Sequence, residues 1–594
     1  MPLPWKIAGV LLFLASNTLA QLTQRVSLSG SGTEVHGRSL SPVLSADGRY
    51  VAFVSEADDL VPGDTNGVRD VFVRDRIAGT TERISVATGG TQGDDNSDSP
   101  TISADGRCIA FRSFATNLVA GDTNGCSDVF VRDRVAGTTV RISVSSAGLE
   151  TSGDCDLPSI SADGNLVAYS SSGDNLVPGD TNFRDDVFLR NLSAGTTERL
   201  SLTNGGGQGN SGSDEPVLSP DGRYLSFDSD ANNLVPGDTN ASEDVFVRDR
   251  LLGTTERVSV SSSGAEGNDD TGQSSISADG RFVSFYSIAT NLVANDTNAL
   301  GDVFVHDRQT GTTVRVSVSS SGTQADLGSI SGWLSADGHA LVFVSYATNL
   351  VAGDTNGVPD IFRHDLLLGT TERVSLSSAG AQADLGSTTD FLSADGRFVA
   401  FGSDATTLVP GDTNAVGDIF VRDHSPASFS SLCDPGLAGV VACPCSNPPA
   451  GTGRGCDNSA ATGGASLSAS GVAYLSSDSL VFTTSGELPS ATSILLQGDA
   501  LVAGGLVFGQ GVRCAGGALK RLYAKTASSG SVTAPDFGVG DPSVSARSAQ
   551  LGDTIQPGEM RAYLVYYRDP SVLGGCPATS TFNATQTGLI SWQP

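Results

Sequence analysis

The sequence predicts an all-β chain: a seven-bladed β-propeller closed by its N-terminal strand, followed by a smaller disulfide-bonded β-sandwich domain. Two markers with the same spacing of 58 residues predict the propeller. A Ser-(Ala/Pro)-Asp-Gly turn recurs at Asp47, Asp105, Asp163, Asp221, Asp279, Asp337 and Asp395. A Gly-Asp-Thr-Asn segment keeps the same step, with Asn295 replacing the glycine in the fifth copy. A fixed period of this size with strand-like contents is typical of radially repeated β-sheets.

Each repeat is expected to form one blade of four antiparallel strands. In the first copy the alternating apolar runs are residues 42–44, 50–55, 71–74 and 83–86, and tight glycine-containing turns join the first pair and the last pair. An aromatic residue recurs in the second run and a phenylalanine in the third, and we expect both to pack between neighbouring blades. These residues are Phe53, Phe111, Tyr169, Phe227, Phe285, Phe343 and Phe401, and Phe72, Phe130, Phe188, Phe246, Phe304, Phe362 and Phe420.

The two ends of the array predict a closed ring. The seventh copy stops after its third strand, at residues 421–423, and lacks a fourth. Residues 23–28, Thr-Gln-Arg-Val-Ser-Leu, match the missing strand, and Arg25 lies one period before Arg83. Pairing of this N-terminal segment with the last copy completes seven blades and leaves no exposed sheet edge.

The chain divides by composition into residues 1–20, 22–424 and 426–594. The first segment has a basic start with Lys6, an apolar run over residues 7–15, and Thr-Leu-Ala before Gln21, which predicts a secretory signal peptide. An uncleaved anchor is the alternative, although the run is short for a membrane span, and no later stretch predicts one. The last segment lacks the period and contains six of the nine cysteines.

The net charge of −30 lies almost wholly in the repeat array. Such a surface repels nucleic acid and anionic lipid, and it favours cations or basic partners, although solubility alone also explains it. In each blade the two long connections, residues 56–70 and 87–99 in the first copy, emerge on the same side. We name this side the acidic loop face and expect function there.

The turn and strand Ser-(Ala/Pro)-Asp-Gly-Arg-x-(Val/Leu/Ile)-(Ala/Ser)-(Phe/Tyr), followed by Asp-Val-Phe-Val-Arg-Asp, resembles the TolB-type, WD-like propeller repeat over residues 22–424. The long Asn-Leu-Val-x-Gly-Asp-Thr-Asn insertion departs from that pattern. Members of this superfamily bind proteins, act as lyases or gate peptidases, so the resemblance implies architecture more than activity. The Cys-Asp-Pro-Gly…Cys-Pro-Cys-x-Asn-Pro-Pro segment of the tail is similar to tails of large exported bacterial proteins, which implies export.

Each long insertion presents oxygen ligands at positions i, i+2 and i+6 of a tight loop, a pattern that suits calcium. Structural turns that cap their own backbone are the alternative. The residue after each asparagine is glycine in only three copies, so a left-handed backbone is not demanded there. The candidate ligands are Asp64, Asn66, Asp70, Asp122, Asn124, Asp128, Asp180, Asn182, Asp186, Asp238, Asn240, Asp244, Asp296, Asn298, Asp302, Asp354, Asn356, Asp360, Asp412, Asn414 and Asp418.

No catalytic residue is predicted. The histidines His36, His306, His339, His364 and His424 have no metal spacing, and no Gly-x-Ser-x-Gly elbow is present. His306 and His364 replace arginines of other repeats, which indicates repeat variants. Chemistry by loop carboxylates, as in glycoside hydrolases, stays open because acids are abundant.

The cysteines indicate an oxidising compartment. The tail has an even set, which predicts three disulfides, with zinc binding as the alternative: Cys433, Cys443, Cys445, Cys456, Cys514 and Cys576. In the array we expect Cys126 and Cys155 to bridge neighbouring blades and Cys108 to stay unpaired.

Together these features predict an exported, non-catalytic binding or scaffold protein, secreted or held at the cell surface. It would bind a protein or polysaccharide ligand on the acidic loop face. The alternatives are a calcium-dependent binder of polysaccharide or protein, and a carbohydrate-active enzyme that uses loop carboxylates.

Overall fold

The computed structural model describes residues 23–378, 380–424, 430–433, 435–436, 440–445, 447–450, 454–470, 473, 480–508, 510–536, 541–556, 559–569 and 582–592. The predicted signal peptide lies outside these residues. The chain forms two compact units, Gln21–His424 and a unit that contains Ser425–Pro594. Within the described residues, no helix has the length and apolar character needed to cross a membrane.

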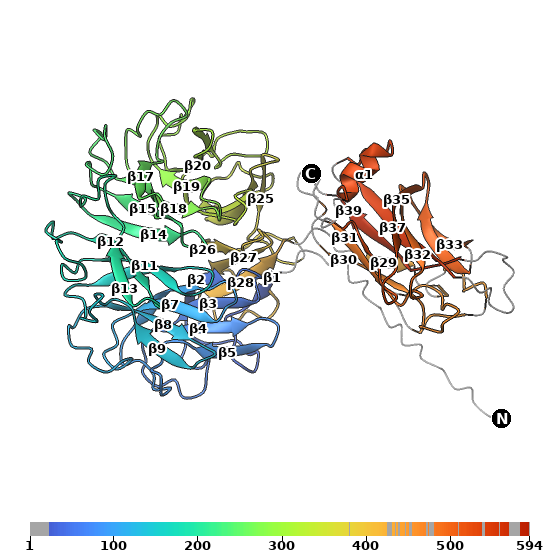
Figure 1. Ribbon diagram of the computed structural model, residues 1–594, viewed down its shortest axis with the longest axis horizontal. Helices are drawn as coiled ribbons and strands as arrows, with labels where there is room; N and C mark the ends of the chain where they lie inside the picture. Colours follow the sequence, from blue (N-terminus) through green and yellow to red (C-terminus); the bar gives the residue numbers. More distant parts are fainter. Residues whose placement is uncertain are drawn as a thin grey trace, which may run out of the picture. The chain divides into compact units, whose positions relative to one another are not determined.

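The first unit is a propeller of seven four-stranded antiparallel sheets, which confirms the predicted fold class (Figure 1). The inner strands are β2 (Ser39–Leu44), β6 (Ser97–Ile102), β10 (Cys155–Ile160), β14 (Ser213–Leu218), β18 (Thr271–Ile276), β22 (Ser329–Leu334) and β26 (Ser387–Leu392). The second strands are β3 (Tyr50–Ser55), β7 (Cys108–Ser113), β11 (Leu166–Ser171), β15 (Tyr224–Ser229), β19 (Phe282–Ser287), β23 (Ala340–Ser345) and β27 (Phe398–Ser403).

The third strands are β4 (Asp70–Asp75), β8 (Asp128–Asp133), β12 (Asp186–Asn191), β16 (Asp244–Asp249), β20 (Asp302–Asp307), β24 (Asp360–Asp365) and β28 (Asp418–Asp423). The outer strands are β5 (Thr80–Arg83), β9 (Thr138–Arg141), β13 (Thr196–Arg199), β17 (Thr254–Arg257), β21 (Thr312–Arg315), β25 (Thr370–Arg373) and β1 (Thr23–Arg25). The outer strand of the first copy therefore covers residues 80–83, earlier than the predicted 83–86, and the inner strand is longer than the predicted 42–44.

The N-terminal strand closes the ring as predicted. β1 pairs with β28 in the sheet β1-β28-β27-β26, and Figure 1 shows the start of the array beside its end. Arg25 lies opposite Phe420, in the register that places Arg83 opposite Phe72 in the first blade. The seventh blade therefore has the same hydrogen-bonded edge as the other six.

The repeated Ser-x-Asp-Gly turn has a local physical cause. The Ser45 hydroxyl donates to Asp47 Oδ1 at 2.7 Å, and the same oxygen accepts the Arg49 backbone N–H at 3.0 Å. Gly48 has φ +67, and a Cβ there would lie 2.2 Å from the Phe398 ring of the neighbouring blade. Both the left-handed turn and the close packing of the next blade require glycine.

The core lies between blades. One cluster joins Phe53 and Phe72 of the first blade to Ile419 and Val421 of the seventh, and the other blade pairs repeat this arrangement. Both phenylalanines are fully buried, and their rings lie 6.0 Å apart between centroids. The prediction that these aromatics pack between neighbouring blades is confirmed.

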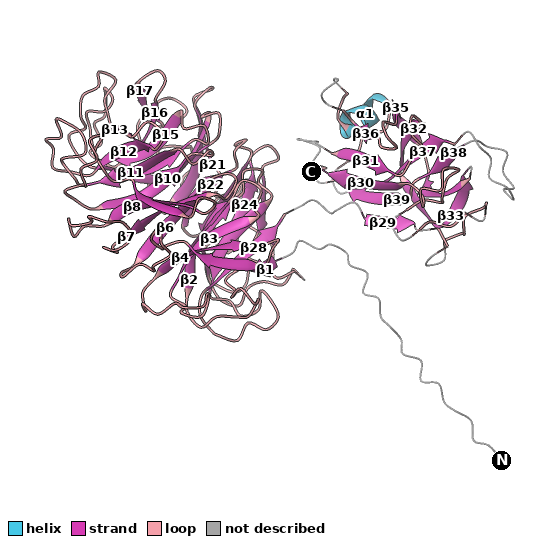
Figure 2. Cartoon of the chain, turned by 60° about the horizontal axis from the view of Figure 1, so that its bottom comes forward, coloured by secondary structure: helices cyan, strands magenta, loops and turns pink. Residues whose placement is uncertain are grey.

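The second unit is also built from strands, with one short helix, as Figure 2 shows. Its elements are β29 (Ser430–Cys433), β30 (Ser466–Ser470), β31 (Val481–Ser485), β32 (Thr492–Gly498), β33 (Ala500–Phe508), β34 (Gly511–Gly516), β35 (Lys520–Thr526), β36 (Thr533–Ala534), α1 (Val544–Gln550), β37 (Met560–Arg568), β38 (Phe582–Ala584) and β39 (Thr587–Ser591). The sheets β30-β31-β36 and β29-β39-β37-β32-β35 share one core that includes Phe482, Tyr563 and Trp592.

Four cysteines of the tail are disulfide-bonded, and the three of the array are free. Cys443 pairs with Cys456, and Cys445 and Cys514 each belong to a disulfide, whereas Cys576 and the side chain of Cys433 lie outside the described part of the chain. Cys126 and Cys155 are free, so the predicted bridge between blades is wrong. Cys155 begins β10 with its side chain 1% exposed in the core, while Cys126 lies in a loop.

Candidate functional site

The predicted ligand loops each close around an arginine of the outer strand. In the first blade, Arg83 Nη1 lies 2.8 Å from Asp64 Oδ1 and 3.1 Å from Asp70 Oδ2. The Ser85 hydroxyl donates to the other oxygen of Asp70, which is fully buried. Asn66 Nδ2 donates to Asp70 Oδ2 at 3.0 Å and to the Gly93 carbonyl at 3.0 Å. We name this arrangement the arginine clamp.

All seven copies form the clamp. The arginine and its two aspartates are Arg83 with Asp64 and Asp70, Arg141 with Asp122 and Asp128, Arg199 with Asp180 and Asp186, Arg257 with Asp238 and Asp244, Arg315 with Asp296 and Asp302, Arg373 with Asp354 and Asp360, and Arg25 with Asp412 and Asp418. Asn124, Asn182, Asn240, Asn298, Asn356 and Asn414 each donate to a backbone carbonyl of the following loop, as Asn66 does. The candidate ligands therefore meet a guanidinium, which supplies the positive charge within each loop.

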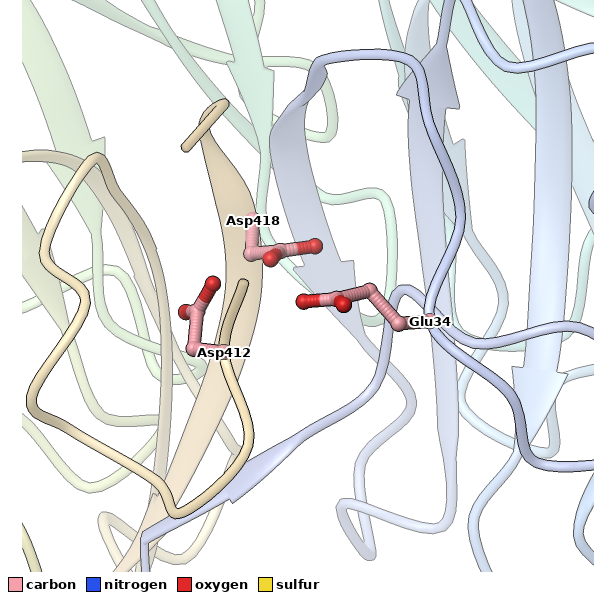
Figure 3. Close-up of side chains that lie close together, drawn as sticks. All are labelled: Glu34, Asp412 and Asp418. Atoms are coloured by element: carbon pink, nitrogen blue, oxygen red, sulfur yellow. The ribbon is translucent and has the colours of Figure 1, made fainter. Parts of the chain in front are cut away.

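The clamp at the ring closure carries a third carboxylate. Figure 3 shows Glu34, Asp412 and Asp418 with their carboxylates turned toward one another. Among the described residues, this is the one group of three histidine, cysteine or acidic side chains spaced closely enough for a shared metal ion. Arg25 Nη1 lies 2.7 Å from Glu34, 3.4 Å from Asp412 and 3.0 Å from Asp418. The arginine thus contacts every carboxylate of this group.

The residue after each clamp asparagine has a left-handed backbone, contrary to the expectation from its sequence. Its φ is between +53 and +68 in all seven copies, four of which are not glycine: Gly67, Gly125, Phe183, Ala241, Ala299, Gly357 and Ala415. The asparagine side chain bonds across this residue, since Asn124 Oδ1 accepts the Cys126 backbone N–H at 3.1 Å. The clamp therefore holds non-glycine residues in a costly conformation.

A cavity of about 480 Å³ follows the propeller axis between the seven inner strands. Most of its lining is apolar, and it includes Trp333 and Phe391, whose rings lie 5.0 Å apart between centroids. Glu215 and Gln273 contribute polar groups from the neighbouring strands β14 and β18. This mixture of apolar walls with a few polar groups is typical of binding sites.

The third residue of the inner strands forms a β-bulge with a left-handed backbone. Its φ is between +47 and +56 in six blades, at Ser41, Ser99, Leu157, Glu215, Gln273 and Ser331. The bulge interrupts the register of each inner strand with its neighbour and places these residues at the cavity wall. Strained non-glycine residues of this kind concentrate at functional sites.

Beside the bulges the blades differ from one another in charge. The facing residues of the inner and second strands are Leu40 and Val54, Asp98 and Arg112, Asp156 and Ser170, Asp214 and Asp228, Gly272 and Tyr286, Ile330 and Val344, and Thr388 and Gly402. In the second blade Arg112 pairs with Asp98 at 2.7 Å and also contacts Asp156. In the fourth blade two aspartates face each other, an arrangement that is destabilising for like charges.

Four carboxylates gather at that place on the acidic loop face, and we name them the acidic corner: Asp214, Glu215, Asp228 and Glu243. Among the described residues, no arginine, lysine or histidine forms an ion pair with any of them. Asp228 is 1% exposed; its Oδ2 accepts the Gln273 backbone N–H at 2.6 Å, and its Oδ1 meets no N–H or hydroxyl donor among the described residues. The Glu215 carboxyl group is in hydrogen-bonding contact with that of Asp228, and Glu215 lines the cavity.

Burial and mutual repulsion shift these carboxylates toward their protonated forms. Burial, followed by the charges of Glu215 and Glu243, raises the pKa of Asp228 well above its usual value. Burial raises the pKa of Asp214 to about 6, with Glu215 as the next cause. Burial likewise raises the pKa of Glu243 to about 7, followed by the charge of Asp214. A cation bound at the corner would stabilise the ionised forms.

The acidic corner was not predicted from the sequence, because its residues do not recur in every copy. The sequence signal for it is a residue that is acidic in one copy and not acidic in the others. Asp228 stands where the other copies have Val54, Arg112, Ser170, Tyr286, Val344 and Gly402. A single departure of this kind marks one place in a ring of otherwise similar blades.

The comparisons with known proteins agree on the propeller and go no further. No family model and no curated protein matches the chain. Similar solved structures include an oligogalacturonate lyase in complex with manganese (TM-score 0.42, 12% identity, 69% of this chain and 94% of that chain). A protein assigned as TolB from Agrobacterium tumefaciens is another (TM-score 0.30, 18% identity, 47% and 80%). The β-propeller domain of the Trilobed protease from Pyrococcus furiosus is a third (TM-score 0.41, 11% identity, 65% and 96%). At these identities the likeness concerns the fold alone.

Proposed function

We propose that the chain is an exported, non-catalytic binding or scaffold protein that holds its ligand on the acidic loop face of the propeller. The observation that carries this proposal is the contrast between the clamps and the acidic corner. Every clamp supplies an arginine for its carboxylates, whereas the acidic corner has four carboxylates and no basic side chain in ion-pair contact among the described residues. An uncompensated negative site beside an apolar cavity favours a basic partner.

Export is supported by the leader-like start of the sequence and by the oxidised cysteines of the tail. The disulfide between Cys443 and Cys456 is typical of a protein that folds in an oxidising compartment. The chain would then bind its protein or polysaccharide ligand outside the cytoplasm.

A binding experiment on the full chain tests the proposal. The protein is immobilised and presented with basic proteins and polysaccharides at low and high salt. We expect a ligand whose affinity falls as salt rises, because charge attraction between exposed groups is screened. The double variant Asp214→Asn/Glu243→Gln should weaken that binding at least tenfold. The matched control is Asp58→Asn, which removes one exposed charge from the same face in the first blade and should leave affinity unchanged. Equal binding by all three proteins would contradict the proposal.

One observation favours a second candidate, a carbohydrate-active enzyme. A carboxyl group whose pKa is raised to about 6, such as that of Asp214, is suited to general acid catalysis near neutral pH. A hydrolysis screen over polysaccharides separates the candidates, since an enzyme releases reducing sugar and loses that activity on Asp228→Asn. The binding protein releases none.

A further inference from the structure

Deepening the proposed function, on which this inference rests, we propose that the acidic corner and the adjoining cavity form a site for a primary alkylammonium group, such as a lysine side chain of a partner protein or a free alkylamine. The corner supplies carboxylate acceptors for the ammonium head, and the cavity supplies apolar walls for its stem.

The first step is that the corner has more acceptors than donors. Asp228 is 1% exposed, and its Oδ1 meets no N–H or hydroxyl donor among the described residues. Burying a charged acceptor without a partner costs more than leaving it in water. The same register position in the second blade holds Arg112, which neutralises Asp98 there. The fourth blade therefore lacks a cation where a sister blade carries its own.

The second step is that the fifth blade approaches these carboxylates through a glycine. The fifth blade has Gly272 where other blades have leucine, aspartate, isoleucine or threonine. A Cβ on Gly272 would lie 2.9 Å from Asp228 Oδ2 and 3.5 Å from Glu243 Oε2. A side chain at this position would therefore press on Asp228, and glycine permits the close approach of the two blades.

The third step distinguishes an ammonium from a metal ion. Calcium holds oxygen ligands at 2.3–2.6 Å, so two of its ligands are about 5 Å apart at most. Among the described residues, no three groups of the corner have ligand atoms within 4.8 Å of one another, whereas those of Glu34, Asp412 and Asp418 do. An ammonium nitrogen donates hydrogen bonds about 2.8 Å long, so its acceptor oxygens can be spaced more widely than the ligands of calcium.

The fourth step concerns the stem of the ligand. Glu215 belongs to the corner and also lines the cavity, so the two adjoin at this residue. The rest of the wall includes Trp333 and Phe391 and is mostly apolar. A bare inorganic cation would gain nothing from these walls, whereas an aliphatic amine would bury its methylene groups against them, each worth about 0.8 kcal/mol.

The test titrates the full chain with n-hexylamine and with 1-hexanol, its neutral counterpart, by calorimetry at pH 8. We expect hexylamine to bind at one site at least tenfold more tightly than hexanol. Asp228→Asn and Glu215→Gln should each weaken hexylamine binding tenfold or more. Gly272→Ala should weaken it as well, because its methyl group would lie 2.9 Å from Asp228 Oδ2 and displace that carboxylate without changing the charge. Asp98→Asn is the matched control, an aspartate-to-asparagine substitution at the second-blade position equivalent to Asp214, and should leave binding within twofold. Circular dichroism confirms that each variant is folded.

Three outcomes would overturn the inference: equal binding of hexanol and hexylamine, hexylamine binding that survives all three corner variants, or one tightly bound calcium that Asp228→Asn removes. A second arm uses a capped lysine peptide and its norleucine counterpart. Binding of the lysine peptide identifies a protein side chain as the source of the amine, and binding of hexylamine alone identifies a free amine. If a macromolecular ligand binds the acidic loop face but neither amine does, the proposed function stands and this inference fails.

Discussion

The arginine clamp makes a quantitative prediction about stability. In the clamp of Arg199, Asp180 and Asp186, the arginine side chain is 7% exposed and Asp186 is fully buried. Arg199→Met keeps the apolar stem but removes the guanidinium and leaves both carboxylates without their cation. Breaking a buried ion pair from one side costs about 3–5 kcal/mol.

That cost translates into a small but measurable melting shift. The Gln21–His424 unit has roughly 400 residues, and an unfolding entropy of about 2.1 cal/mol/K per residue amounts to about 0.85 kcal/mol/K. A loss of 3–5 kcal/mol then lowers Tm by about 4–6 °C, provided that the unit unfolds in one transition. Scanning calorimetry of the full chain resolves such a shift. The control is Arg69→Met, which breaks a surface pair with Glu56 whose side chains are 48% and 42% exposed. It should lower Tm by about 1 °C or less.

The same melts decide whether the clamp carboxylates hold calcium. A bound ion raises Tm in proportion to its affinity and concentration. With arginine as the resident cation, the Tm of the wild-type chain should be equal in millimolar calcium and in chelator. A wild-type Tm that rises with calcium, together with an unshifted Tm for Arg199→Met, would refute the clamp and restore these residues as metal ligands.

Three further predictions concern backbone strain, pH and ring closure. Ala241→Gly should stabilise the propeller by about 0.5–1 kcal/mol and Gly125→Ala should destabilise it by a similar amount, because both positions have positive φ and a Cβ on Gly125 would meet no atom within 4 Å; opposite signs in thermal melts check this. Folding raises the pKa of Asp214 and Asp228, so the stability that these two groups contribute is full below about pH 4 and is lost as pH rises through about 6. Chemical denaturation at pH 5 and 8 should show that Asp228→Asn flattens this dependence, and an unchanged slope would contradict it. Deletion of residues 21–28 exposes the edge of β28 and leaves Asp418 without Arg25, so we expect aggregation or a lower Tm, and a stable monomer with unchanged Tm would argue against closure by β1.

The global fold was predictable because each copy repeats its turn chemistry in phase. Ser45, Asp47 and Gly48 form a turn whose hydrogen bonds and positive φ suit the Ser-x-Asp-Gly pattern, and the copy without an outer strand pointed to residues 23–28. The inner strand was harder to predict. In the first blade the bulge residue Ser41 precedes Pro42 and has a left-handed backbone, although a residue before proline prefers an extended one.

The clamp was only half predictable. Its carboxylates and asparagines are close together in the sequence, which suggests a metal site. The arginine comes 19 residues after the first aspartate and lies on another strand. The signal for Arg83 was its strict recurrence in phase with Asp64 and Asp70, which indicates a structural partner. Recognition of that partner required the register in which Arg83 faces Phe72 on β4.

The acidic corner follows the opposite logic, because it is defined by a departure from the repeat. Residues that stabilise all seven blades recur in every copy, as those of the clamps do. A ligand on the axis needs only one binding site, so the residues that bind it should occur in only one or two blades. Asp98 faces Arg112 in the second blade and forms an ion pair with it, whereas Asp214 faces Asp228 in the fourth blade, where burial raises the pKa of both carboxyl groups. The facing aspartates are not needed for packing, since valine occupies the position of Asp228 in the first and sixth blades. The cost is explained if a cation from outside the chain completes the fourth blade as Arg112 completes the second.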